Sequence, residues 1–371
     1  MKKLPLKRLL RLLLPMVLLA VILLGSGKVA KTQLGPDVEN FYVRAKITAV
    51  LEDYSGGEAF TGVQKVTAKV ISGPHKGEIC TLDNPNSYHI GAYGGAGTRI
   101  VALVRVLEDG SLAGSVYNHD RTGMVYLLLG LFALVTVLVG GKKGAATLYA
   151  LVFTFVCVIC MYIPLLYVGM GGIPAAVLTA VTILAASIYI LNGWSRKTLC
   201  AIIGTTLGVA VSGGLAWAVG SGFHLSGYHM EEVEALVFIA NSSRLKISDM
   251  LYAGVLISSL GAVMDVSVSI VAAMDEVRQH SKGLSAKALF ASGMRVGRDM
   301  IGTMSNTLIL AYTGSATGIL MNIYANDMAY LRLISYNPLV IEILCGLCGT
   351  IGVILTVPIQ AAITAWMMKK E

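Results

Sequence analysis

Long apolar runs separated by short polar connections dominate the chain from Met124 onward. One run lies near the start, at residues 9–26, and seven more lie at 124–140, 145–168, 173–191, 198–220, 250–273, 300–323 and 338–367. About 20 consecutive apolar residues are enough for a helix to cross a bilayer. The pattern predicts an all-α polytopic membrane bundle of about eight transmembrane helices.

Residues 38–118 follow a different pattern, in which apolar and polar positions alternate. In FYVRAKITAVL, Phe41, Val43, Ala45 and Ile47 alternate with polar side chains, as in a half-buried strand. VQKVTAKVIS, GEICTL, TRIVALVRVLE and SLAGSVY follow, separated by turn-forming residues. Five short strands predict a small OB-like β-barrel. The AYGGAG segment is expected to be a loop rather than a phosphate-binding turn, because no helix pattern follows it.

The two patterns predict three parts. Residues 1–27 form an N-terminal signal-anchor helix, residues 38–118 a small exported β domain, and residues 123–371 a seven-helix membrane domain. Four basic residues precede the first apolar run and Arg11 lies near its start, as in signal peptides and signal anchors. Gly25, Ser26 and Gly27 would allow cleavage, but we favour a retained anchor.

Charge predicts the orientation in the membrane. The 371 residues are 55% hydrophobic and 13% charged, with a formal net charge of +8. Lys and Arg lie mostly at the ends of apolar runs, which is typical of membrane topology and argues against nucleic-acid binding. The basic loop from Arg278 to Arg298 is expected inside. The chain should therefore lie in the cell membrane with both termini cytoplasmic and residues 38–118 extracytoplasmic.

The segment GAVMDVSVSI places Asp265 within the apolar run 250–273. A charged residue near the bilayer centre costs about 2.5–3.5 kcal/mol on insertion scales. A helical wheel places small residues within about 60° of Asp265, namely Gly254, Ser258, Gly261, Ala262, Ser269 and Ala272. Because such a face lets another helix approach closely, we expect Asp265 to face protein or a cavity.

A second small, polar stripe runs along the next span. Asp299, Thr303 and Asn306 share a face with Gly302, Thr313, Gly314 and Thr317, whereas Met300, Met304 and Leu308 turn away. We expect Asp265 to pack against this Thr303–Asn306 face. Asp299 has a second interpretation, as a carboxylate favoured by the dipole at a helix start.

The last span adds a third carboxylate, Glu342, which is either functional or simply interfacial. The candidate proton or ion relay thus comprises Asp265, Asp299, Thr303, Asn306, Ser258, Ser269 and Glu342. Intramembrane carboxylates of this kind are found in proton relays.

Other chemistry-bearing residues favour structural interpretations. Cys157 with Cys160, and Cys345 with Cys348, form CxxC pairs inside apolar runs, where cysteine is mostly a packing residue. His224, His229, Glu231 and Glu232 could bind a metal, but a solvated face beside a short amphipathic helix in MEEVEALVFIA is favoured. We expect no metal and no cofactor.

Three segments carry a resemblance to a known family. YAGVLISSLGAVMDVSVSI, GMRVGRDMIGTMSNTLILAY and GTIGVILTVPI resemble the YibE/F-like multi-pass membrane proteins over most of residues 120–368. The resemblance implies a bacterial integral membrane protein without cofactor or settled activity. Its matching polar positions are Asp265, Asp299, Thr303 and Asn306. The layout is also similar, more weakly, to the SecD/SecF and RND-type proton-driven machines. This chain has an extra helix pair, however, and lacks the arginine expected inside the helix that follows the basic loop.

Three functions remain in competition. The leading hypothesis is a transporter or export-assisting protein coupled to a proton or ion gradient through Asp265, with an unknown substrate or protein partner at the exported domain. The second is a non-catalytic assembly factor or scaffold, in which the polar stripes only hold helices together. The sequence leaves open whether the protein forms an oligomer. The least favoured is an intramembrane aspartyl protease with Asp265 and Asp299 as its dyad, because the GxGD pattern is absent and a dyad needs close carboxylates. A protein without enzymatic activity is therefore favoured.

Overall fold

A computed structural model describes residues 6–27, 41–56, 61–73, 75–87, 90–107, 110–281 and 284–368, with side chains from Pro15 onward. The chain divides into two compact units. Gln33–Leu138 form one, and Met1–Thr32 with Val139–Glu371 form the other.

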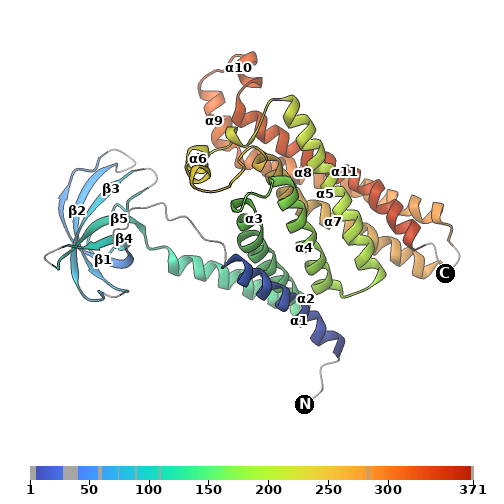
Figure 1. Ribbon diagram of the computed structural model, residues 1–371, viewed down its shortest axis with the longest axis horizontal. Coiled ribbons are helices and arrows are strands. Elements are labelled where there is room, and N and C mark those ends of the chain that lie inside the picture. Colours follow the sequence, from blue (N-terminus) through green and yellow to red (C-terminus); the bar gives the residue numbers. More distant parts are fainter. Residues whose placement is uncertain are drawn as a thin grey trace. The chain divides into compact units, whose positions relative to one another are not determined.

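The first unit contains a closed five-stranded barrel (Figure 1). Its strands are β1 (Phe41–Asp53), β2 (Gly62–Val70), β3 (Ile79–Asn86), β4 (Arg99–Val106) and β5 (Leu112–His119). Neighbours follow the order β1-β2-β3-β5-β4, and only the β3–β5 pair is parallel. All five predicted strands are present. Residues 92–97 connect β3 to β4 without a helix, which confirms the loop predicted for AYGGAG.

Alternation of side chains produces the barrel core. Val43, Ala45 and Ile47 of β1 are each at most 2% exposed, whereas the residues between them face outward. This is the period-2 pattern of a pleated strand with one buried face. Cys80 of β3 lies in the same core. A Cβ at Gly114 of β5 would overlap the carbonyl oxygen of Leu103, so glycine is needed for the close approach of β4 and β5.

The second unit is helical and includes the C-terminal part of α2, from Val139 onward. The helices are α1 (Leu6–Ser26), α2 (Thr122–Cys157), η1 (a π-helix, Val158–Tyr162), α3 (Ile163–Tyr167), α4 (Gly172–Asn192), α5 (Arg196–Gly222), η2 (Gly227–His229), α6 (Val233–Ser242), α7 (Met250–His280), α8 (Ala286–Ser315), α9 (Thr317–Ala325), α10 (Tyr330–Ile334) and α11 (Asn337–Met367). The short α6 lies where an amphipathic surface helix was expected.

The structure does not confirm the predicted number of membrane-spanning helices. Among the described residues, five helical segments are long and apolar enough to cross a membrane, or six if α8 and α9, bent by 62°, count as one span. The predicted spans 124–140 and 145–168 lie in one helical stretch, Thr122–Tyr167. Gly141 interrupts it with non-helical angles (φ 54°, ψ −130°). A count of eight is thus not confirmed.

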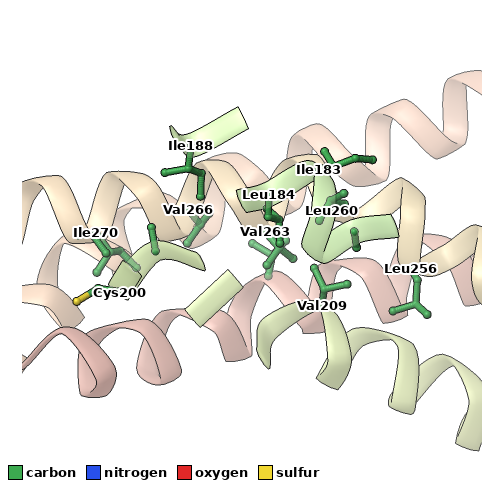
Figure 2. Close-up of a cluster of buried hydrophobic side chains, with 14 of the residues drawn as sticks. Ile183, Leu184, Ile188, Cys200, Val209, Leu256, Leu260, Val263, Val266 and Ile270 are labelled. Carbon is green, nitrogen blue, oxygen red and sulfur yellow. The ribbon is translucent and has the colours of Figure 1, made fainter. Parts of the chain in front are cut away.

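The bundle core forms where α4, α5, α7, α8 and α11 pack side by side (Figure 1). Helix α7 is central because it contacts all four others. Figure 2 shows the apolar side chains that α4, α5 and α7 bring together, which include Ile183, Leu184, Ile188, Cys200, Val209, Leu256, Leu260, Val263, Val266 and Ile270. Polar residues of α7 on the side that faces these helices, such as Ser259 and Ser267, are buried, whereas Ser258 and Asp265 on the other side are exposed.

The barrel generates a testable prediction through Cys80, the single cysteine of residues 38–121. Burial raises the pKa of this thiol, whose side chain is 1% exposed, and thiolate is the reactive form. Residues 38–121 expressed alone should give a soluble, β-rich fold in which Cys80 resists alkylation by iodoacetamide until urea is added. Rapid alkylation without urea, or a disordered product, would show that the barrel does not fold on its own.

Candidate functional site

Asp265 lies midway along α7 and points away from the bundle core. Its side chain is exposed, as are Gly254, Ser258 and Gly261 on the same face. A Cβ added at either glycine would meet nothing within 4 Å. Among the described residues, the Asp265 carboxylate has no hydrogen bond and no ion pair. Asp265 and these small residues therefore form an exposed face of α7.

The polar stripe of α8 is also turned outward. Asp299, Thr303 and Asn306 are exposed, and the Thr303 hydroxyl donates a hydrogen bond to the carbonyl of Met300 at 3.0 Å. The expectation that this stripe packs against Asp265 is wrong. The side of α8 that packs on the core carries Gly293, Gly297, Met300, Met304 and Leu308, three of which were expected to turn away.

Close helix packing explains this orientation of α8. A Cβ at Gly293 would overlap the side chain of Met274 on α7, and one at Gly297 would overlap Val357 on α11. These glycines thus let α8 approach both neighbours at once. Asp299 consequently faces away from α7, and the two carboxylates of the suggested aspartyl dyad do not face each other.

A different residue, Tyr312, links α8 to the Asp265 face. Its hydroxyl donates a hydrogen bond of 2.7 Å to the Oγ of Ser258, which in turn donates to the carbonyl of Val255 at 3.1 Å. Ser269, on the other side of Asp265, is half-buried. Glu342 is half-buried on α11 and lines a cavity together with Tyr312.

The interior of the bundle holds a buried polar column that the sequence analysis did not identify. We define it by eight of the buried polar residues of α5, α7 and α11, namely Thr205, Ser212, Ser259, Ser267, Thr350, Thr356, Gln360 and Thr364. At its three-helix junction, the Ser212 hydroxyl lies 3.3 Å from the Ser259 hydroxyl and 3.2 Å from the Cys348 carbonyl oxygen.

Gln360 is the largest member of the column and is fully buried. Its amide nitrogen donates to the carbonyl of Cys200 at 3.1 Å and to the hydroxyl of Thr364 at 3.0 Å. Its Oε1, like the hydroxyl oxygens of Thr350 and Ser267, has no hydrogen-bond partner among the described residues. Each unpaired buried polar atom costs about 1–3 kcal/mol. These three oxygens are therefore places where the column can accept a further hydrogen bond.

One end of the column meets a charged pair. Lys197 at the start of α5 forms an ion pair with Asp275 of α7, which also accepts a hydrogen bond from Gln279. Asp275 is 8% exposed. A cavity of about 370 Å³ opens beside Lys197 and is bounded by the α4–α5 connection and α7. The column therefore ends at a paired, buried carboxylate next to a polar opening.

Glycines on α5 make room for the column. A Cβ at Gly204 would overlap Gln360, and one at Gly208 would overlap Thr356. Two sequence patterns could have revealed the column: the GxxxG spacing of these two glycines, and the polar residues Thr356, Gln360 and Thr364 at every fourth position. Asp275 and Lys197 carried no such signal, because they are 78 positions apart and lie at the ends of apolar runs.

The histidine, acidic and cysteine candidates do not come together as a metal site within the part of the chain that the structure describes. The Nδ1 of His229 accepts a hydrogen bond from the backbone N–H of Ser226 at 3.1 Å, within η2. Among the described residues, no three His, Cys, Asp or Glu side chains are grouped so as to hold a metal ion. Both CxxC pairs are free thiols, and Cys157 and Cys348 are buried.

Comparison with known proteins places most of the helical unit in one family. The family model described as "YibE/F-like protein" matches residues 128–370. No curated protein and no solved structure gave a match. The family match together with the long apolar helices indicates a membrane protein.

The packing around the column predicts the effect of adding one methyl group. Gly208→Ala should destabilise the protein by about 1–3 kcal/mol, since the new Cβ meets Thr356 and Val263, both stiff β-branched side chains. Unfolding in detergent with increasing dodecyl sulfate would measure this. Gly214→Ala on the same helix is the matched control, because nothing lies within 4 Å of its added Cβ. Equal stability of the two variants would contradict the close α5–α11 approach.

Proposed function

The chain belongs to the YibE/F-like family, and we propose that it is a transporter or export-assisting membrane protein coupled to a proton or ion gradient. The titrating group is Asp265. The polar column, Asp299 of α8 and Glu342 of α11 are the further candidate groups for moving the proton or ion.

The observation that carries the proposal is the unpartnered carboxylate of Asp265 on a membrane-spanning helix. A charged, unpaired carboxylate in hydrocarbon is expensive, and such residues persist mainly where they have a function. Away from water the neutral, protonated form is the favoured one. Asp265 would hold a proton while its face is covered by lipid or protein and release it when water reaches that face.

The buried polar column supports a polar path through the bundle. Its polar contacts include the Ser212–Ser259 pair, the Gln360 amide on the Cys200 carbonyl, and the Lys197–Asp275 ion pair. Polar residues inside a transmembrane bundle mark substrate and ion pathways. The unpaired oxygen of Gln360 provides an acceptor within this path.

The barrel is proposed to contact the substrate or a partner outside the cell membrane. Its outer surface has a hollow of about 490 Å³ lined by Lys65, Asp83 and Arg105, a mixture of charges suited to polar ligands. The basic residues from Arg278 to Arg298, at the end of α7 and in the first half of α8, favour a cytoplasmic position for this end of the two helices. This orientation requires Thr122–Tyr167 to cross the membrane twice, on the two sides of Gly141. Both termini are then cytoplasmic, and the barrel is extracytoplasmic.

A scaffold is the second candidate, because both polar stripes point outward. Asn306 on α8 and Asp265 on α7 are exposed, and polar side chains on lipid-facing surfaces hold transmembrane helices of different chains together. In this function Asp265 remains hydrogen-bonded to a partner helix and never changes its charge.

Proton entry into liposomes distinguishes the two functions. Purified protein is reconstituted with an internal pH-sensitive dye, and a potassium diffusion potential is imposed. Asp265→Asn keeps shape and hydrogen bonding but cannot titrate, so it should reduce proton entry by about tenfold or more. Glu276→Gln is the matched control, since Glu276 lies on the same α7 face but near the helix end, and it should conduct like the parent chain.

Two results would contradict the coupling proposal. One is an Asp265→Asn variant that conducts as well as the parent protein. The other is a parent protein that conducts no better than empty liposomes, which would favour the scaffold.

A further inference from the structure

We propose that the end of the bundle where α8, α9 and α11 meet is a binding site for an amphipathic amine, a molecule with a cationic ammonium head and a short hydrocarbon body. The proposal does not depend on the role of Asp265. It rests on two adjoining cavities that share one carboxylate, Glu342.

The first cavity takes the hydrocarbon body. It lies between α8 and α11, has a volume of about 230 Å³, and is lined mainly by Ile309, Leu320, Leu339, Ile343 and Leu347. An apolar protein cavity of about 150 Å³ holds benzene, so this one accepts a somewhat larger apolar group. Gly346 also lines this cavity, and a Cβ there would lie in ordinary contact with the Tyr312 ring, 3.6 Å away.

The second cavity takes the cationic head. It has a volume of about 430 Å³ and is lined by Glu231, Glu342, Asn322, Tyr336 and Ser315, among others. Two carboxylates thus border one space, and no Lys, Arg or His is among the described residues that line either cavity. An ammonium group would pair with the carboxylates and donate hydrogen bonds to them.

Glu342 joins the two cavities because its side chain lines both. The aromatic rings of Tyr312 in the first cavity and Tyr336 in the second add faces that attract a cation. The Tyr312 ring is held in place by the 2.7 Å hydrogen bond from its hydroxyl to Ser258. A head at Glu342 therefore leaves its hydrocarbon body pointing between α8 and α11.

The test measures binding of octylamine to the purified full-length protein in nonionic detergent, by the shift in unfolding temperature and by titration calorimetry. Octylamine should bind, whereas octanol, which lacks the charge, and ethylamine, which lacks the body, should bind at least about tenfold more weakly. Octanol binding as tightly as octylamine would overturn the proposal, since an apolar cavity alone would then suffice.

Variants locate the site. Glu342→Gln should weaken octylamine binding about tenfold, and Gly346→Leu, which fills the first cavity, by a similar factor. Glu234→Gln is the matched control: Glu234 is an exposed carboxylate on α6 outside both cavities, and its loss should change nothing. Unfolding temperatures without octylamine verify that each variant is folded. Unchanged affinity in folded Glu342→Gln and Gly346→Leu would contradict the proposal.

A competition arm identifies the source of the ligand. Displacement of octylamine by a short-chain phosphatidylethanolamine indicates a lipid headgroup, whereas persistent octylamine binding indicates a soluble amine. Either result keeps the site, and neither bears on proton entry through Asp265.

Discussion

The close approach of α5 and α11 over glycine is the constraint on which the bundle depends. Gly204 and Gly208 on α5 lie against Gln360 and Thr356, and Gly352 on α11 lies against Ser212. In a membrane there is no hydrophobic driving force between helices, so tight packing and interhelical hydrogen bonds hold them together. Small residues at this contact bring the hydroxyl and amide groups of the column within reach of one another.

This packing also decides what the neighbouring helices display. Helix α7 turns Val263, Val266 and Ile270 toward the interior, so Asp265 on its opposite face is left outside. Helix α8 approaches through Gly293 and Gly297, which turns Asn306 outward as well. The membrane unit thus has polar groups in two settings: a column satisfied mostly from within, and carboxylates that only lipid, water or another molecule can cover.

Sequence patterns predicted the elements better than their orientation. Alternation fixed all five barrel strands, because a strand with one buried face has an unambiguous period. The inward face of α8 was misassigned. A helical wheel separates its small polar residues from its apolar ones, but both kinds can pack against another helix in a membrane. The wheel therefore does not show which of the two faces is turned to the bundle core. The Lys197–Asp275 pair and the Tyr312–Ser258 hydrogen bond join residues far apart in the chain, and no local pattern predicts them.

The central claim is that Asp265 carries a proton within the membrane and gives it up. Infrared difference spectra of the reconstituted protein, recorded while pH is raised, measure this directly. The account predicts a protonated-carboxyl band in the parent protein that disappears as pH rises and is missing from Asp265→Asn. Identical spectra for the parent protein and Asp265→Asn at every pH would contradict it.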